Sequence, residues 1–238
     1  MEQVKRRGLL PEDDRFFAPA MLPKLSAARE EVRYLLDRGY PMHSALSFVG
    51  NHHQLSSRQQ VALGRTTDSA AALERRRSTR LDPSGMSGQT AHIDGLNLII
   101  TLEVALSDGM LFRAQDDVIR DLAALRGTYR LIPQTRPAIA MLRDALADLD
   151  VSGAIVYLDA PVSNSGKLKA AFFEESWPIP LAVELVRNPD AILKTLGGVF
   201  SGDAIILDHC DSWFNAVAWI LETRGMLPTL SRLIPVNP

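Results

Sequence analysis

The sequence predicts an α/β fold: a C-terminal parallel sheet in a three-layer arrangement, preceded by a small all-α region. Apolar runs at 153–158 and 181–186 have the pattern of parallel strands that are covered on both faces. They alternate with amphipathic helical segments, which is typical of a parallel sheet with helices on both sides. From residue 24 to residue 75, the apolar side chains recur at helical intervals, which predicts three helices. We therefore expect domains at 1–78 and 91–238, joined by a linker at 79–90.

The N-terminal part contains several helix signals. Residues 1–24 hold three prolines and predict an irregular arm. Apolar positions recur at helical intervals from Lys24 to about residue 37, and a second helix is expected at 42–49. Ser56 and Gln59 form a capping-box pattern that predicts a third helix from about residue 57. The outline is that of a helix-turn-helix.

The C-terminal part alternates strand and helix signals. Apolar periodicity predicts helices after Asp94 and over 114–126, 135–149 and 212–224. Strands are expected at 91–93, 153–158, 181–186 and 199–200, with a last short one near 205–207. The segment 74–90 has a run of arginines followed by a proline and two glycines. This composition predicts a helix end followed by a flexible linker.

Composition limits the class of protein. Hydrophobic residues make up 46% of the chain, which is enough to bury a core. A formal net charge of −2 at pH 7 argues against a basic coat for nucleic acid but permits a local basic patch. The single cysteine, Cys210, excludes an internal disulfide and favours a reducing compartment. Without an apolar run for a signal or a membrane span, we expect a cytoplasmic protein that has no membrane partner.

Aspartates follow most of the expected strands. Asp94, Asp159 and Asp208 come directly after apolar runs, and Asp203 follows 199–200 closely. Because the carboxyl ends of parallel strands meet at one edge, these side chains are expected to converge there. Two carboxylates about 4 Å apart repel by roughly 4 kcal/mol at an effective dielectric of about 20, so they would recruit a cation. Oxygen ligands suit Mg²⁺ or Mn²⁺.

Each of these aspartates also fits a plainer role as a helix N-cap. Asp190, within an Asn-Pro-Asp turn, is the strongest candidate for such a cap. Glu103 fits a solvated helix residue, although it could face the strand ends. Asp117 and Asp121 fit surface ion pairs on the expected helix at 114–126.

Short motifs connect this edge to known nucleases. The Asp-Gly-Leu-Asn string at 94–97 resembles the first-strand signature of PIN and NYN-type nucleases, and Asp159 and Ser201-Gly202-Asp203 resemble their later acidic positions. The resemblance covers roughly residues 90–222. It implies a Mg²⁺ or Mn²⁺ site acting on RNA, with Asp94, Asp159 and Asp203 as ligands. Asn97 would orient a ligand or water, and Asp208 would be a further ligand or a supporting acid. Ala204 stands where NYN proteins often have a second aspartate. PIN domains often place a further acid in the helix after the first strand, and Glu103, Asp117 and Asp121 compete for that position.

Two longer strings point to a second resemblance. Residues 34–46 and 93–106 are similar to a two-domain family of prokaryotic proteins known only as domains of unknown function.

Basic residues offer candidate contacts to nucleic acid. Arg58 and Arg65, with Arg75, Arg76 and Arg77 downstream, could contact a phosphate backbone from the helical region. The alternative is that this region is a packing module or the contact of a homodimer.

A second basic candidate and several absent motifs complete the survey. Lys167, in the Ser-Gly-Lys turn at 165–167, could hold a phosphate, although the glycine and Ser/Thr positions of a P-loop are missing. The histidines and Cys210 show no zinc spacing.

Three functions remain open. The leading hypothesis is a metal-dependent nuclease acting on RNA or single-stranded nucleic acid. The alternative is a non-catalytic nucleic-acid-binding or regulatory protein with a degenerate PIN-like domain. A third is a phosphatase with Asp94 as the nucleophile, although the Asp-x-Asp pattern of such enzymes is missing.

Overall fold

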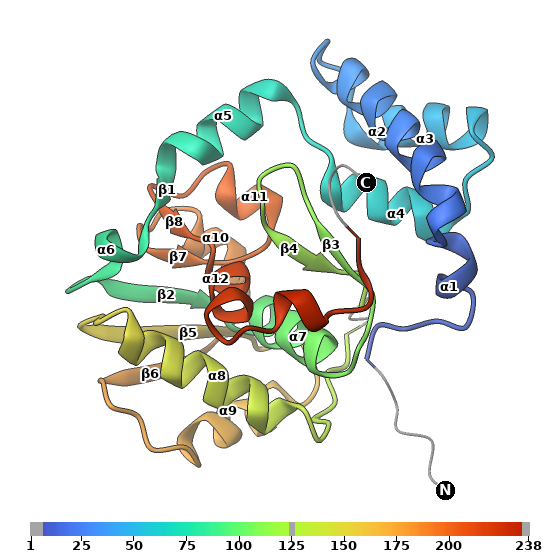
Figure 1. Cartoon of the computed structure of the whole chain (residues 1–238). Helices are drawn as coiled ribbons and strands as arrows, with labels where there is room; N and C mark the ends of the chain where they lie inside the picture. Colours follow the sequence, from blue (N-terminus) through green and yellow to red (C-terminus); the bar gives the residue numbers. More distant parts are fainter. Residues whose placement is uncertain (1–6, 124–126, 235–238) are drawn as a thin grey trace, which may run out of the picture.

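A six-stranded parallel sheet organises the C-terminal part of the computed structural model, which describes residues 7–123 and 127–234 (Figure 1). The strand order is β1-β8-β7-β2-β5-β6, and every neighbouring pair is parallel. The strands are β1 (Arg80–Leu81), β2 (Thr90–Asp94), β5 (Gly153–Asp159), β6 (Leu181–Val186), β7 (Val199–Phe200) and β8 (Trp213–Phe214). The expected parallel sheet is therefore confirmed.

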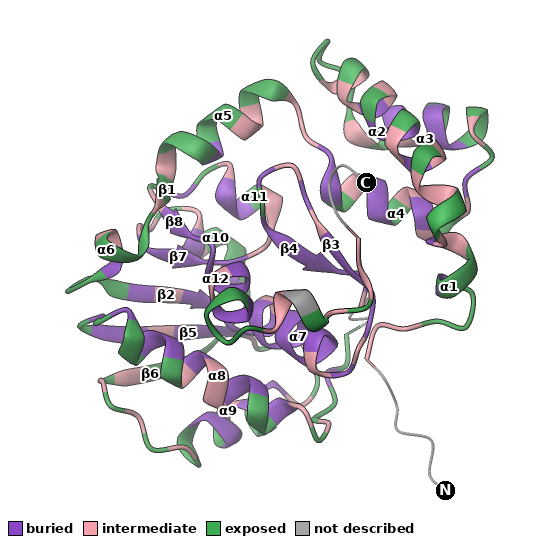
Figure 2. Ribbon diagram, in the orientation of Figure 1, coloured by how far each residue is buried: buried purple, intermediate pink, exposed green. Residues whose placement is uncertain are grey.

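Helices cover both faces of this sheet. They are α6 (Pro83–Met86), α7 (Gly95–Leu106), α8 (Thr135–Asp148), α9 (Ser165–Phe173), α10 (Pro189–Leu193), α11 (Ala204–Leu207) and α12 (Ala216–Thr223). Neighbouring residues of a strand point to opposite faces. Accordingly, Val156 joins the apolar cluster of α7, α8 and α12, whereas Tyr157 joins a separate cluster with Leu193 of α10 and Ile206 of α11. Most residues of the central strands β2 and β5 are buried (Figure 2). Strand β6, expected to be covered on both faces, instead lies at the edge of the sheet, and only its Val183 is buried.

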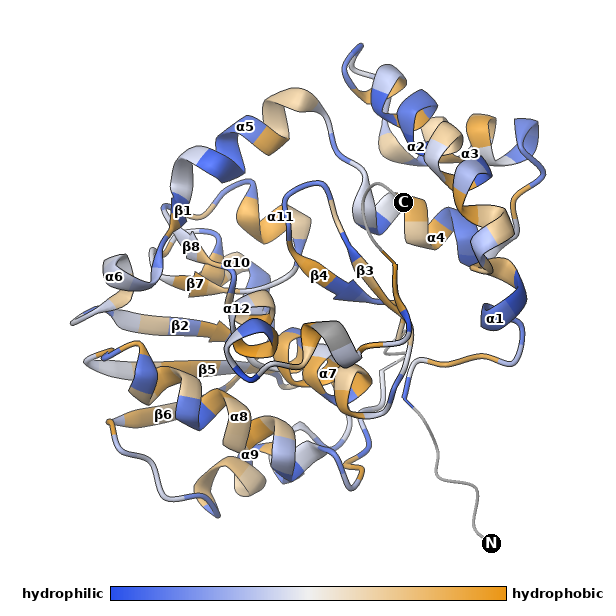
Figure 3. Ribbon diagram, in the orientation of Figure 1, coloured by the Kyte–Doolittle hydropathy of each residue, from blue (hydrophilic) through white to orange (hydrophobic). Residues whose placement is uncertain are grey.

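Helix α7 fixes the end of β2. Every residue of α7 is buried except Asn97 and Leu106, which accounts for its almost wholly apolar sequence (Figure 3). A Cβ on Gly95 would lie 2.6 Å from side-chain carbons of both Val156 and Leu158 on β5. Only glycine lets the helix start so close to the sheet, and this close approach sets the position of Asp94.

The N-terminal region is helical over residues 24–75, as expected, but helical turns also form within the segment 13–23 that was expected to be irregular. It contains α1 (Asp13–Phe16), the 3₁₀ turn η1 (Pro19–Met21), α2 (Leu22–Leu36), α3 (Met42–His52), α4 (Ser57–Thr66) and α5 (Ala70–Thr79). The capping box of Ser56 and Gln59 forms at the start of α4. Helix α4 ends at Thr66. A separate helix, α5, then begins, with Ser69 as its N-cap. Residues 1–6 of the expected arm lie outside the described residues.

The helical region shares a core with a small second sheet. Strands β3 (Leu111–Arg113), β4 (Ile119–Asp121) and β9 (Leu233–Ile234) form it in the order β4-β3-β9. Phe112 and Leu122 pack in one apolar cluster with Val32 of α2 and Leu63 of α4. The two regions are therefore joined through buried side chains as well as through the chain.

The structure corrects several expected elements. Residues 114–123 form the turn and second strand of a hairpin, not a helix, because Asp117 takes a left-handed conformation (φ 64°) and turns the chain; residues 124–126 lie outside the described part. Residues 204–207 are helix α11, not a strand, because Asp203 caps them. The segment 212–224 begins with strand β8 before α12.

The expected linker at 79–90 is structured. It contains β1, which pairs in parallel with β8 at the edge of the sheet, and the short helix α6. Among the described residues, no helix is both long enough and apolar enough to cross a membrane.

Candidate acidic site

Five aspartates line one cavity of about 290 Å³. They are Asp94 of β2, Asp121 of β4, Asp159 of β5, Asp190 of α10 and Asp203, which precedes α11. Asn97 and Arg65 complete its polar lining. Three of the four expected ligands, Asp94, Asp159 and Asp203, thus meet at the carboxyl edge of the sheet.

Asp94 is the most deeply buried aspartate of the expected set. It ends β2, is 7% exposed, and its Oδ2 accepts a hydrogen bond of 2.8 Å from Ser201 Oγ. Burial raises the pKa of Asp94 to about 7, and repulsion from Asp203 and Asp190 acts in the same direction. The Ser201 hydroxyl stabilises the charged form and opposes the shift.

Asp190 belongs to the acidic group as well. The cap of α10 is Asn188, whose Oδ1 accepts from the Ala191 amide at 3.1 Å, so the sequence assigned the capping role to the wrong residue of the turn. Burial and repulsion from Asp203 raise the pKa of Asp190. Burial and repulsion from Asp190 likewise raise the pKa of Asp159. These carboxylates therefore oppose one another's ionisation within one cavity.

Asp203 has two roles in the structure. Its Oδ1 accepts hydrogen bonds from the amides of Ile205 at 2.7 Å and Ile206 at 3.3 Å, which caps α11. Its second oxygen accepts no hydrogen bond from a residue that the structure describes, and the side chain lines the cavity. A cap and a ligand role are compatible because a carboxylate has two oxygens.

The loop that carries Asp203 is held by side chains of the site itself. Asn97 Oδ1 accepts from the Gly202 amide at 2.8 Å, and Ser201 Oγ accepts from the Asp203 amide at 3.0 Å. Ser201 therefore bonds both to Asp94 and to the backbone of Asp203. The side-chain oxygen of Asn97 thus positions this loop, and the residue, expected to orient a ligand or water, also lines the cavity.

Asp121 is one of three acids, with Glu103 and Asp117, between which the nuclease resemblance left a further acidic position open. It is 4% exposed, and its oxygens accept from Thr101 Oγ1 at 2.8 Å and from the Ala123 amide at 2.7 Å. The sequence placed it on a surface helix. A strand assignment for 119–121 would have put it at a strand end, where the other acids are.

Arg65 of α4 brings the helical region to the cavity. Its Nη1 donates to the carbonyl oxygen of Asp121 at 2.8 Å and lies 3.9 Å from that residue's carboxylate, while 41% of the side chain stays exposed. Arg65 also lines a neighbouring cavity of about 400 Å³, together with Asn97, Asp121 and Asp203. This second cavity extends from the acidic group toward Met42 of α3 and toward α11. The positively charged side chain of Arg65 therefore lines both cavities.

Asp208 does not line the cavity of the five aspartates, although it lines the neighbouring cavity with Asp121 and Asp203. It follows helix α11 rather than a strand, and its Oδ1 accepts from Arg76 Nε at 2.7 Å. Arg76 is fully buried and also donates to Asp68 and Asp116, both at 2.7 Å. The roles expected for Asp208 as a ligand and for Arg76 as a phosphate contact are thus replaced by a buried ion-pair cluster. This cluster ties α5 to the β3–β4 turn and to α11.

The other basic candidates divide into internal and exposed side chains. Arg58 forms a two-point ion pair with Asp13, with both distances 2.9 Å, and is committed to the interior of the helical region. Arg75 donates to the Asp208 carbonyl. Arg77, 79% exposed and paired with Glu74, and Lys167 on α9 remain open to solvent. Arg75 is exposed as well, so Arg65, Arg75, Arg77 and Lys167 are the expected contacts that could reach a nucleic acid.

Glu103 is neither solvated nor part of the cavity. Its side chain is fully buried. The Tyr129 hydroxyl donates to its Oε1 at 2.6 Å, and Arg7 Nε lies 2.7 Å from its Oε2. Burial raises its pKa.

The donor set of the cavity suits a hard cation. Carboxylate oxygens are the ligands that Mg²⁺ and Mn²⁺ prefer. Among the described residues, only Glu31, His52 and His53 bring three ligand atoms within 4.8 Å of one another, so the aspartates stand farther apart than a closed three-ligand cage. Mg²⁺ usually keeps several waters and uses one or two carboxylates, so such a wider arrangement fits it.

Comparison with known proteins places the chain in a family. Residues 83–219 match a domain of unknown function (DUF5616), and residues 24–79 match a protein of unknown function (DUF434). An uncharacterized protein of Methanocaldococcus jannaschii is 33% identical over 187 residues, which cover 77% of this chain and 88% of that protein. No solved structure matches the chain. The match to the first domain spans more than half of the sequence, and the chain therefore belongs to the DUF5616 family, with a DUF434 region before that domain.

Proposed function

We propose that the protein is a metal-dependent nuclease that cleaves RNA or other single-stranded nucleic acid. The observation that carries this proposal is the convergence of Asp94, Asp159, Asp190 and Asp203 on one cavity at the carboxyl edge of the sheet. Burial and mutual repulsion raise the pKa of three of them, Asp94, Asp159 and Asp190. A bound cation would stabilise such a group of carboxylates, because its positive charge offsets their mutual repulsion.

The sequence motifs support the same function. Asp94 and Asn97 belong to the string that resembles the first-strand signature of PIN and NYN-type nucleases, and Asp203 belongs to the later Ser-Gly-Asp string. We extend the resemblance to a PIN-like domain only as part of this proposal. Asp190 belongs to neither string, and we add it to the proposed set because it lines the same cavity.

Asp94, Asp159, Asp190 and the free oxygen of Asp203 would hold Mg²⁺ or Mn²⁺. When bound, such an ion activates water and neutralises charge on a phosphodiester. Ser201 and Asn97 keep the Asp203 loop against β2 through their hydrogen bonds. The chain thereby holds the acids in place before substrate arrives.

Arg65 would bind the phosphate of the substrate. It is the exposed cation in the lining of both cavities, and its guanidinium is fixed by the Asp121 carbonyl. Cavities of about 290 and 400 Å³ are of a size that takes individual nucleotides, which favours a single strand over a duplex.

Cleavage of a mixed pool of RNA and single-stranded DNA, with Mn²⁺ or Mg²⁺ present, tests the proposal. Asp94→Asn and Asp190→Asn should each abolish cleavage. Asp211→Asn, a matched change of an exposed aspartate outside both cavities, should leave it intact.

Other outcomes point to the alternative functions. Binding of the pool without cleavage by the unmodified protein would indicate a non-catalytic nucleic-acid-binding protein. Release of phosphate from a small ester, lost in Asp94→Asn, would indicate a phosphatase. Cleavage that survives in both site variants would refute the assignment of the cavity.

A further inference from the structure

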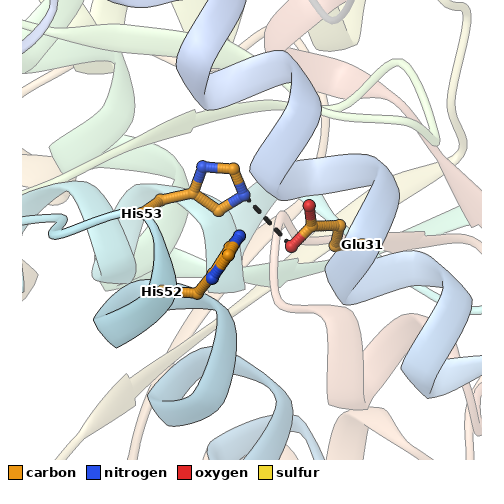
Figure 4. A group of neighbouring side chains, drawn as sticks. All are labelled: Glu31, His52 and His53. Atoms are coloured by element: carbon orange, nitrogen blue, oxygen red, sulfur yellow. Dashed lines mark ion pairs between the residues drawn. The ribbon is translucent and has the colours of Figure 1, made fainter.

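A second cluster of ligand-type side chains lies in the helical region. Glu31 projects from α2 toward His52, the last residue of α3, and His53, which follows it (Figure 4). One ligand atom from each of the three lies within 4.8 Å of the other two. None of the three lines either cavity of the acidic site.

The contact between His53 and Glu31 is close but is not an ordinary hydrogen bond. His53 Nε2 lies 3.0 Å from Glu31 Oε2. The nitrogen is buried, yet it forms no hydrogen bond of acceptable geometry with any residue of the described chain. With the ring proton on Nδ1, this nitrogen offers a lone pair that the neighbouring carboxylate cannot satisfy and that a metal ion can accept.

The end of α3 brings the two imidazoles together. The His53 amide donates to the Val49 carbonyl at 2.9 Å, and Leu55, which is buried, donates from its amide to the Gly50 carbonyl at 2.8 Å. These bonds fold the chain back after the helix and set the ring of His53 at 85° to that of His52, with 4.8 Å between ring centres. The negative end of the helix dipole also favours a cation here.

We propose that Glu31, His52 and His53 bind a transition-metal ion of the Zn²⁺ type. Two imidazole nitrogens and one carboxylate oxygen form a ligand set that zinc uses in sites with an open fourth position. Such a set prefers borderline metals, whereas the aspartate cavity offers only hard oxygen ligands. His52 is exposed, so solvent or a further ligand can reach the open position.

The sequence did not reveal this group because its spacing is unlike that of common zinc motifs. Two adjacent histidines and a glutamate on a different helix converge only when α2 packs against α3. A bound ion would link these two helices at the end where α3 turns toward α4. Because the unfolded chain does not hold the three groups together, binding would stabilise the folded form.

Metal titration of the full-length protein, freed of any purification tag and stripped with a chelator, tests this site. Calorimetry with Zn²⁺ measures stoichiometry and affinity, and the visible absorption of bound Co²⁺ reports nitrogen and oxygen ligation. One ion per chain is expected. His53→Ala and Glu31→Gln should each lower Zn²⁺ affinity by more than the roughly 10–100-fold that loss of an outer partner of a metal ligand costs.

Two control variants separate this site from others. His43→Ala removes an exposed histidine from the start of the same helix and should keep the affinity of the unmodified protein. Asp94→Asn alters the acidic cavity and should also bind Zn²⁺ normally. Circular dichroism establishes that each variant is folded, and Glu31→Gln keeps the size of the side chain if His53→Ala perturbs the helix end.

Two results would overturn the proposal. One is Zn²⁺ affinity that is unchanged in both His53→Ala and Glu31→Gln. The other is tight binding that is lost in Asp94→Asn and retained in the histidine variant, because the ion would then occupy the acidic cavity.

Discussion

Replacing Asp94 with asparagine should make the metal-free protein more stable at pH 8 while abolishing the proposed activity. Asp94 is 7% exposed, and burial with repulsion from Asp203 and Asp190 raises its pKa from 3.8 to about 7. Each pKa unit corresponds to about 1.4 kcal/mol, so a charged Asp94 costs the folded state up to about 4 kcal/mol. Asparagine has nearly the same shape and carries no charge.

The pH dependence of this gain has a definite sign. The pKa of Asp94 is higher in the folded protein than in the unfolded chain, so the folded state holds the extra proton between about pH 4 and 7. The free energy of unfolding therefore falls as pH rises through that window. Below it, Asp94 is protonated in both states and asparagine brings no advantage. The bond from Ser201 already lowers the pKa of Asp94, so the cost derived from the pKa includes that bond, and the expected gain from asparagine at pH 8 is about 4 kcal/mol.

Urea unfolding of the chelator-treated protein at pH 5 and pH 8 measures this difference. The gain from Asp94→Asn should be at least about 2 kcal/mol larger at pH 8 than at pH 5. Asp211→Asn, at an exposed position, should change the free energy of unfolding by less than about 0.5 kcal/mol at either pH. A variant that is less stable than the unmodified protein at pH 8, or that differs by the same amount at both values, would refute the reasoning.

Divalent cations provide a second arm of this experiment. Mg²⁺ or Mn²⁺ bound near Asp94 would remove the electrostatic cost and stabilise the unmodified protein. Asp94→Asn should respond far less. Equal stabilisation of both proteins by the ion would mean that it binds elsewhere.

Three further predictions concern other parts of the molecule. Arg76→Met should destabilise the protein by about 3–5 kcal/mol in urea unfolding, because three aspartates lose their buried cation; an effect under about 1 kcal/mol would contradict the ion-pair cluster. Gly95→Ala should cost about 1–3 kcal/mol because its methyl would overlap the β5 side chains, whereas Gly166→Ala, with open space around it on α9, should be neutral or stabilising. Arg65→Ala should weaken binding of single-stranded nucleic acid and lower the salt dependence of binding by about one ion, as fluorescence polarisation at several salt concentrations would show, without changing unfolding by more than about 1 kcal/mol.

The parallel sheet was predictable because its two longest strands, central β5 and edge strand β6, leave a simple signature. Strands β5 and β6 are apolar runs bounded by turn residues, and α7 carries apolar residues around its whole circumference. Strands β1, β7 and β8 have two residues each, which is too short for any periodicity to appear. Their place in the sheet depends on partners that are distant in the sequence, so β1 was taken for part of a linker.

The acids of the site illustrate a different limit. Position after a strand correctly brought Asp94, Asp159 and Asp203 to one edge. The distinction between a cap and a cavity residue depends on which side chain in a turn reaches the helix amides, and Asn188 and Asp190 compete for that role in one short turn. Local sequence cannot rank two good caps that stand two residues apart. The structure can, since only one of them accepts the bond.

The run of arginines after residue 74 shows why charge alone did not identify the basic surface. Arg76 is the one buried residue of helix α5, whose other residues are exposed or half-buried, so its sequence has almost no apolar face to reveal which side is buried (Figure 2). Arg76 is buried because Asp68, Asp116 and Asp208 surround it, and these come from three separate segments. A buried arginine is tolerated only with such partners, and partners this distant are invisible in a local pattern.

These contacts also bear on how the two regions of the chain could work together. Separating the helical region from the sheet would expose Phe112 and Leu122 and would leave Asp116 without Arg76. It would also withdraw Arg65 from the cavity. The helical region therefore does not act as a loosely tethered recognition module. Its contribution to the acidic site is the cation Arg65, held at the cavity by its bond to the Asp121 carbonyl, and the proposed substrate would meet both charges in one cleft.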